Sequence, residues 1–68
     1  MIIAINGTDT ELPDGVTVAG VLAELKLPRV TRGVAVAVQG EVVPRREWVS
    51  TPLRDGDRVE VVSAIQGG

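Results

Sequence analysis

The 68-residue sequence contains no cysteine, histidine, tyrosine or phenylalanine, and Trp48 is its only aromatic residue. Without cysteine and histidine the chain can form no disulfide, and it offers no thiolate nucleophile, imidazole base or Cys/His zinc site. Serine, threonine, lysine and carboxylate residues remain, but they form no recognisable catalytic signature. We therefore expect no independent enzyme, no metal site and no bound cofactor.

The sequence also has little excess charge of either sign. Seven Lys and Arg residues against nine Asp and Glu residues give a net charge of −2. The basic residues are spread along the chain, so there is no basic stripe for nucleic acid. The apolar segment Met1 to Ile5 lacks the basic flank and long apolar run of a signal peptide, and no stretch approaches the roughly 20 apolar residues of a membrane helix. These absences predict a soluble cytoplasmic protein that binds neither nucleic acid nor membrane.

Valine is what the sequence has in abundance. Hydrophobic residues make up 44% of the chain, and valine dominates them. Branched side chains of this kind favour β-strands. A chain of 68 residues is long enough for one small domain, which buries only about 60% of the surface that its unfolded chain exposes. We expect residues 1–68 to form a single β-rich domain that is monomeric when free.

The first 15 residues predict a β-hairpin. Ile2 to Ile5 has the composition of a strand, and Asn6-Gly7 is a strong hairpin signal because both positions of the favoured turn need positive φ. Asp9 to Leu12 is the predicted returning strand. Pro13-Asp14-Gly15 has the composition of a turn and closes this unit.

A short amphipathic helix is predicted next. Thr17 is a candidate N-cap residue. The i, i+3, i+4, i+7 spacing predicts one apolar face, which consists of Val18, Val21, Leu22 and Leu25. Gly20 weakens such a helix by up to about 1 kcal/mol relative to alanine, so tertiary packing must stabilise it. Pro28 is expected to end the helix, and residues 29–32 are expected to form a loop.

The middle of the chain predicts two strands. In Val34 to Val38, valine alternates with alanine, so both faces are apolar, as in a central strand covered by a helix. Gln39-Gly40 predicts a tight turn into a short strand, Glu41 to Val43. Pro44 lacks a backbone N–H and ends the pairing.

The last third predicts a helical turn and a final strand. Arg45 to Trp48 is expected to form the turn and to place Trp48 against the core. Asp55-Gly56-Asp57 predicts a tight turn rather than a metal site, because glycine supplies the positive φ. Arg58 to Ile65 is the predicted last strand, and residues 64–68 are expected to form a flexible tail ending in Gly-Gly.

The predicted order is strand, strand, helix, then two or three further strands. Parallel pairing of the first and last strands at the centre would give a mixed sheet of four to five strands with one helix packed across it. This is an α+β architecture of the β-grasp, or ubiquitin-like, type.

Three motifs in this order resemble the ThiS family, the sulfur carrier proteins of thiamine biosynthesis. They are Pro44-Arg45-x-x-Trp48, Asp55-Gly56-Asp57 and the terminal Gly67-Gly68. The resemblance extends over nearly the whole chain, from the first strand ending in Asn6, and is strongest from Val42 onward. Each motif is weak alone, but the three together in so short a chain are specific.

The resemblance implies that the protein is a co-substrate and not a catalyst. A terminal carboxylate is ionised at neutral pH and is a poor electrophile. In the family, an E1-like enzyme uses ATP to adenylate it, and sulfur from a persulfide then converts it to a thiocarboxylate. The sulfur-carrying residue would be Gly68. Gly67 would keep the tail thin, and Ala64, Ile65 and Gln66 would lie in the partner's channel.

The partners implied by the resemblance are three. They are an E1-like adenylating enzyme, a sulfur donor such as a cysteine desulfurase or a persulfide protein, and thiazole synthase, which receives the sulfur. The missing cysteine agrees with this chemistry, because a sulfur carrier without a thiol must hold sulfur elsewhere.

Other functions share parts of this pattern. The small subunit of molybdopterin synthase has the same fold, the Asp-Gly-Asp turn and Gly-Gly, but it is usually longer and often has a proline pair before the tail. A carrier for tRNA thiolation and a ubiquitin-like modifier joined to lysines through Gly68 also stay open. From a different class, the chain could be a β-grasp interaction module whose tail has no role.

Surface and core interpretations compete for the remaining residues. Trp48 is either an interface anchor or part of the small core. Arg45 and Arg46 could steer an acidic partner, although a solvated surface is the better expectation for them and for Glu47. The open side of the sheet could expose an apolar patch for docking.

Overall fold

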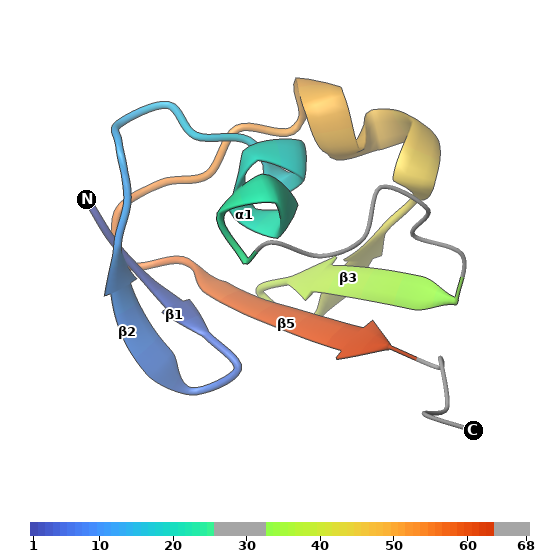
Figure 1. Ribbon diagram of the computed structural model, residues 1–68, viewed down its shortest axis with the longest axis horizontal. Helices are drawn as coiled ribbons and strands as arrows, with labels where there is room; N and C mark the ends of the chain where they lie inside the picture. The colour runs from blue at the N-terminus through green and yellow to red at the C-terminus, as the bar shows by residue number, and fades with distance from the viewer. Residues whose placement is uncertain (26–32, 64–68) are drawn as a thin grey trace.

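The computed structural model describes residues 1–25 and 33–63. Their helices and strands are β1 (Ile2–Ile5), β2 (Thr8–Glu11), α1 (Val18–Glu24), β3 (Val34–Val38), β4 (Glu41–Val43), the 3-10 helix η1 (Arg45–Ser50) and β5 (Arg58–Ser63). The five strands form one sheet in the order β2-β1-β5-β3-β4. In Figure 1, α1 and η1 lie on the same side of this sheet.

The pairing of the strands confirms the β-grasp prediction. β1 runs parallel to β5 at the centre of the sheet, whereas the β1–β2, β3–β4 and β3–β5 pairs are antiparallel. A parallel pair needs a long crossover connection, and here the chain between β1 and β5 supplies the helix and the second hairpin. The result is a mixed sheet with helical structure over one face.

Both predicted hairpin turns are present. Asn6 and Gly7 have φ values of 50° and 85°, and Gln39 and Gly40 have values of 53° and 84°. Two consecutive left-handed residues make a type I′ turn, whose twist matches that of the flanking strands. The second strand begins one residue earlier than predicted, at Thr8. Leu12 follows the strand and is buried.

Helix α1 follows the predicted start but not the whole predicted apolar face. The Thr17 side chain caps it, since Oγ1 accepts a hydrogen bond from the Gly20 N–H at 3.2 Å. The first three predicted face residues are buried, namely Val18, Val21 and Leu22. The prediction for Leu25 is wrong: this residue, the C-cap that follows Glu24, is 39% exposed. Pro28 and residues 29–32 lie outside the described residues.

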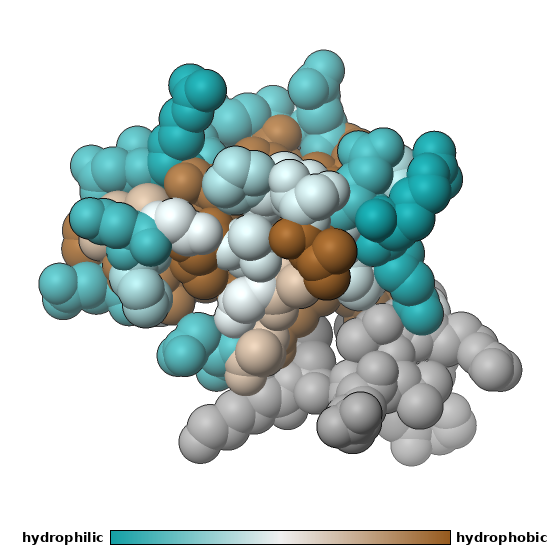
Figure 2. Space-filling view, turned by 90° about the horizontal axis from the view of Figure 1, so that it is seen from above, coloured by the Kyte–Doolittle hydropathy of each residue, from teal (hydrophilic) through white to brown (hydrophobic). Residues whose placement is uncertain are grey.

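The core lies between the sheet and the two helical segments. Its sheet side includes Ile3, Val36 and Val59, which are at most 1% exposed. Trp48 closes the core from η1 and donates a hydrogen bond from Nε1 to the Val43 carbonyl at 2.9 Å. η1 is longer than the single turn expected, since it continues to Ser50. Seen from the α1 side, hydrophilic side chains surround the smaller hydrophobic areas that reach the surface (Figure 2).

Candidate functional site at the end of strand β5

The five residues predicted to form the reactive tail, Ala64, Ile65, Gln66, Gly67 and Gly68, lie outside the described residues. The described chain reaches them through β5, whose last residue is Ser63. The predicted strand continued to Ile65, so its last two positions also lie outside the described residues. The site can therefore be built from β5 and from the residues that hold β5 in place.

Strand β5 lies between β1 and β3, and the two neighbours support it unequally (Figure 1). On the β3 side, pairing extends from Val59, opposite Val38, to Ser63, opposite Val34. On the β1 side, only two residue pairs are in register, and the later one is Ile5 with Val59. Beyond Val59, regular pairing therefore holds β5 from one side only.

Two amide side chains from the hairpin turns also bind the β5 backbone. The Asn6 side chain accepts a hydrogen bond from the Val61 N–H at 2.8 Å and donates one to the Val61 carbonyl at 3.1 Å. Near the start of the strand, Gln39 Oε1 accepts from the Arg58 N–H at 2.6 Å. The sequence predicted Asn6 and Gln39 only as turn formers. The dipeptides Asn6-Gly7 and Gln39-Gly40 predict the turns, but no neighbouring residue indicates which strand the side-chain amides bind.

The Asp55-Gly56-Asp57 segment is a turn, as predicted. Gly56 has a φ of 89°, and the turn is closed by Arg54 N–H to Asp57 Oδ2 at 2.8 Å and Asp57 N–H to the Arg54 carbonyl at 2.9 Å. Among residues 1–25 and 33–63 there is no group of three His, Cys, Asp or Glu side chains that could hold a metal ion. The Asp57 side chain thus binds the backbone of the turn that leads into β5.

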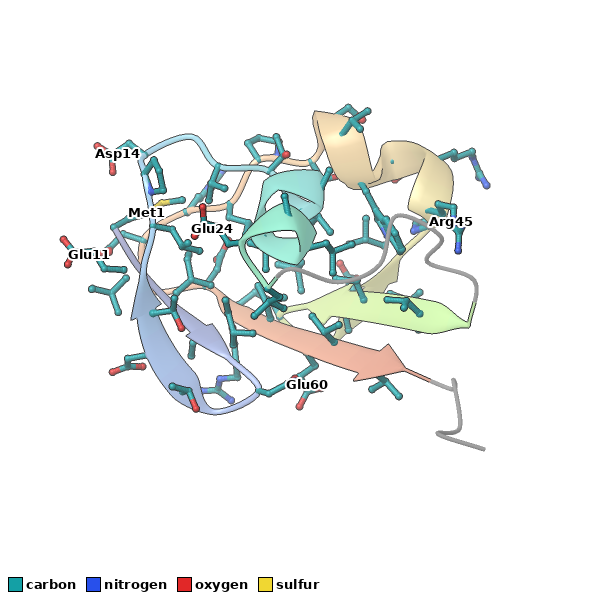
Figure 3. The ribbon with its side chains drawn as sticks, in the orientation of Figure 1. Met1, Glu11, Asp14, Glu24, Arg45 and Glu60 are labelled. Atoms are coloured by element: carbon teal, nitrogen blue, oxygen red, sulfur yellow. The ribbon has the colours of Figure 1, made fainter. Side chains whose placement is uncertain are left out.

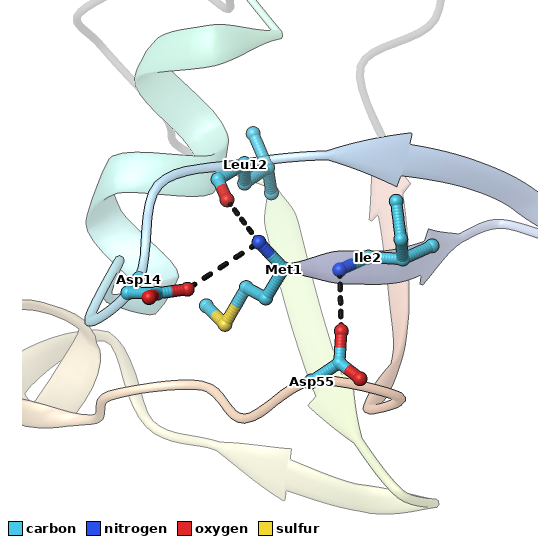
Figure 4. A network of polar contacts seen from close by, with 5 residues as sticks. All are labelled: Met1, Ile2, Leu12, Asp14 and Asp55. Carbon is cyan, nitrogen blue, oxygen red and sulfur yellow. Dashed lines mark hydrogen bonds and ion pairs between the residues drawn. The ribbon is translucent and has the colours of Figure 1, made fainter.

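The same turn binds the beginning of β1. Asp55 Oδ1 accepts a hydrogen bond from the Ile2 N–H at 2.7 Å (Figure 4), and the Gly56 N–H donates to the Ile2 carbonyl at 2.8 Å. Nearby, the Met1 ammonium group donates to the Leu12 carbonyl at 2.8 Å. Side chains therefore prolong the contact between β1 and β5 at both ends, with Asp55 at its start and Asn6 at its end.

The sheet face opposite α1 carries an exposed apolar strip next to β5. Val62 is 61% exposed and Val42 is 73% exposed. The strand registers place Val62 opposite Ala35 and Val42 opposite Ala37, and alternation puts these residues on the face away from the buried Val36. Figure 3 shows Glu60, from the same face of β5, directed away from α1. The open face therefore exposes Val42 and Val62 together with the charged Glu60.

Trp48 is a core residue rather than an exposed anchor. Its side chain is 6% exposed, and the Arg45 guanidinium carbon lies 5.4 Å from the centre of its ring. Arg46 and Glu47 are exposed, as expected for a solvated surface. The motif Pro44-Arg45-x-x-Trp48 thus has a structural basis, in which η1 begins after the proline and presents the indole to the core.

Two hollows on the surface lie away from the end of β5. One of about 340 Å³ is lined by Gln39, Gly40, Arg58 and Glu60, at the beginning of the strand. The other, of about 380 Å³, lies beside β4 and includes Glu47, Thr51 and Arg54. In the second hollow, the Thr51 hydroxyl donates its hydrogen bond to the backbone carbonyl of Glu47 and not to a carboxylate. In the described part of the chain, no helix has the length and apolar character needed to cross a membrane.

Comparison with protein families gives a match over nearly the whole sequence. The model of the ThiS family matches residues 2–68. Among curated relatives, a sulfur carrier protein ThiS from Thermus thermophilus is 42% identical over 64 residues, which are 94% of this chain and 95% of that protein. A thiazole synthase from Paramagnetospirillum magneticum is 35% identical over 68 residues; this chain spans only 20% of its length.

Solved structures show the same architecture. This chain superimposes on a crystal structure of the thiamine biosynthesis protein ThiS from Geobacter metallireducens with a TM-score of 0.82 and 30% identity, covering 100% of both chains. A solution NMR structure of a thiamine biosynthesis protein from the same organism gives a TM-score of 0.83 at 30% identity, with 100% of this chain and 88% of that chain covered. The β-grasp fold and the family match thus agree.

Proposed function

We propose that this chain, which belongs to the ThiS family, is a sulfur carrier that holds sulfur as a thiocarboxylate on Gly68 and delivers it for thiazole formation in thiamine biosynthesis. The observation that carries this proposal is the extent of the similarity: the family match includes Gly67-Gly68, and 94% of the chain aligns with the carrier of Thermus thermophilus. The protein acts as a co-substrate of the enzymes that load and unload it.

The chemistry assigned to the tail begins with activation. A Gly68 carboxylate oxygen attacks the α-phosphorus of ATP within an E1-like enzyme, and pyrophosphate leaves. The acyl adenylate has AMP as a good leaving group, which the free carboxylate lacks. Because glycine has no side chain, Gly67 and Gly68 leave the carbonyl accessible in a narrow channel, and we assign Ala64, Ile65 and Gln66 to the part of the tail that fills that channel.

Sulfur transfer then takes two steps. The terminal sulfur of a persulfide on the donor attacks the Gly68 carbonyl carbon, and AMP leaves, so that an acyl disulfide joins the two proteins. A thiolate cleaves the sulfur–sulfur bond, which releases the thiocarboxylate and leaves a disulfide on the donor side. These steps need ATP, a persulfide and a thiol, and we therefore place the carrier in the cytoplasm.

Thiazole synthase is the proposed acceptor. The similarity to a thiazole synthase from Paramagnetospirillum magneticum supports this choice. That longer protein contains a segment similar to this chain, so a carrier-like segment and a protein named thiazole synthase occur there in one polypeptide. The cysteine desulfurase or persulfide protein that donates sulfur is proposed from the chemistry alone.

Intact-protein mass spectrometry tests the proposal. After incubation with the E1-like enzyme, ATP and a persulfide source, we expect a mass gain equal to the exchange of one oxygen for sulfur. A variant lacking Gly68 is the control and should show no gain, while its Trp48 fluorescence should show that it is folded. If the full-length protein also shows no gain, the carrier function is wrong, and an interaction module becomes the better interpretation.

A second incubation identifies the acceptor. Adding thiazole synthase and its other substrates to the loaded protein should return its mass to that of the carboxylate. If the loaded protein keeps its sulfur there but loses it to the large subunit of molybdopterin synthase, the carrier belongs to molybdopterin formation instead.

A further inference from the structure

The Asn6 side chain continues the ladder between β1 and β5 after the β1 backbone has turned away. The Asn6 N–H donates to the Val59 carbonyl at 2.9 Å, as in any parallel pair. In a regular ladder, the next two bonds would join the Val61 N–H to the Asn6 carbonyl and the residue-8 N–H to the Val61 carbonyl. The chain cannot make them, because Asn6 and Gly7 are left-handed and lead into β2.

The Asn6 amide supplies both missing groups. Its Oδ1 accepts from the Val61 N–H at 2.8 Å, where the backbone carbonyl would have stood. Its Nδ2 donates to the Val61 carbonyl at 3.1 Å, in place of the N–H of residue 8. Asparagine suits this position for a second reason, since it tolerates positive φ better than most residues that carry a side chain.

Gln39 makes a similar substitution at the other end of β5. The Gln39 N–H donates to the Arg58 carbonyl at 2.8 Å. In a second hydrogen bond, Gln39 Oε1 accepts from the Arg58 N–H. In an antiparallel pair the backbone carbonyl of Gln39 would accept that bond. The two amides differ in their distance from the tail: Val61 lies two residues before Ser63, whereas Arg58 lies about 17 Å away along the strand.

We propose that Asn6 is a positioning residue for sulfur loading. By holding the Val61 backbone from the β1 side, it orients the end of β5, and so the point from which residues 64–68 start toward the activating enzyme. This role rests on the function proposed above. Without the amide, β5 keeps its bonds to β3, so the fold persists, but past Val59 the strand end is held from one side and spends less time in the conformation that the enzyme binds.

The expected effect is on binding of the carrier and not on the chemical step. When only a fraction of molecules has the binding-competent conformation, the apparent affinity equals the intrinsic affinity multiplied by that fraction. Two exposed hydrogen bonds of ordinary strength together correspond to about tenfold in such an equilibrium. We therefore expect the KM for the carrier in adenylation to rise about three- to tenfold with kcat unchanged.

Asn6→Gly is the main test, with Gln39→Gly as its matched control. Glycine adopts the left-handed conformation at either position without strain, so each variant removes a side-chain amide and little else. ATP–pyrophosphate exchange with the E1-like enzyme gives KM and kcat for the carrier, and amide hydrogen exchange by NMR reports on Val61. Asn6→Gly should raise KM and speed Val61 exchange about tenfold, whereas Gln39→Gly should leave KM at the wild-type value.

The outcomes separate this inference from the proposed function. If Val61 exchange accelerates in Asn6→Gly while KM stays unchanged, or if Gln39→Gly raises KM equally, the positioning role is wrong although the carrier function stands. If wild-type protein is not adenylated at all, both fail. Asn6→Asp keeps an acceptor for the Val61 N–H but places a carboxylate oxygen where Nδ2 faces the Val61 carbonyl. It should therefore also raise KM, even if the glycine variant folds poorly; a wild-type KM for Asn6→Asp would also count against the proposal.

Discussion

Gly20→Ala should destabilise this protein although it removes the weakest helix former from α1. A Cβ atom built on Gly20 lies 2.7 Å from Val16 Cγ2 and 3.7 Å from Thr17 Oγ1. Carbon atoms in contact are normally about 3.5–4.0 Å apart, so the valine methyl would have to move by about 1 Å. Val16 is half-buried against the core, and its branched side chain has few allowed rotamers.

The balance of two opposing terms sets the expected size. Alanine gains about 0.8–1.0 kcal/mol over glycine in a helix interior. Crowding in a packed site costs about 1–3 kcal/mol. We therefore expect Gly20→Ala to lower the free energy of unfolding by about 1 kcal/mol, which corresponds to a fall of about 4–8 °C in Tm for a domain of this size.

A double-mutant cycle with Val16→Ala isolates the crowding. In the Val16→Ala background the methyl group is absent, so Gly20→Ala should stabilise the protein by nearly the full propensity gain of about 1 kcal/mol. Urea unfolding followed by far-UV circular dichroism measures all four proteins. If Gly20→Ala is stabilising by the same amount in both backgrounds, the close approach of Val16 does not explain the glycine, and the reasoning is refuted.

Three further substitutions test local features by the same unfolding assay. Thr17→Ala should lose about 1 kcal/mol because the Gly20 N–H loses its cap, whereas Thr17→Ser, which keeps a hydroxyl, should lose much less. Trp48→Phe should lose about 1–3 kcal/mol, since it leaves the Val43 carbonyl without its indole donor and the core less full; an unchanged midpoint would contradict this. Gly56→Ala should lose about 1–2 kcal/mol through its φ of 89° alone, as no atom lies within 4 Å of the added carbon, and Gly56→Asn should lose less.

The strands and turns were predictable because their signals are local. Asn6-Gly7 and Gln39-Gly40 set type I′ turns through their own backbone preferences, and strand β3 carries valine on its core face. The errors are at boundaries: β2 begins one residue early, and Leu25, the C-cap residue after the end of α1, is exposed. An apolar spacing continues past a helix end whether or not the backbone does, so the pattern alone could not locate that end.

The candidate site also has a part that the sequence predicts and a part that it does not. The Gly67-Gly68 ending and the motifs before it carry the resemblance that implies a thiocarboxylate on Gly68; these two residues lie outside the described part of the chain, and that assignment stays a prediction. The residues that bind β5 could not be predicted, since Asn6 and Val61 are 55 positions apart and the bond between them exists only when β1 and β5 lie side by side. The asparagine is visible in the sequence, but its partner is not.

The sequence by itself determined the hairpin turns, the alternation of the central strands, the cap of α1 and the family to which the chain belongs. The turns, the strands and the cap depend on each residue's own conformational preferences and on its near neighbours, and the family depends on motifs that are read directly from the sequence. The tertiary structure alone decided that Gly20 makes room for Val16, and that the amides of Asn6 and Gln39 replace backbone groups along β5. Such contacts require the packed chain, because they join groups whose distance is set by the sheet and the core and not by their separation along the sequence.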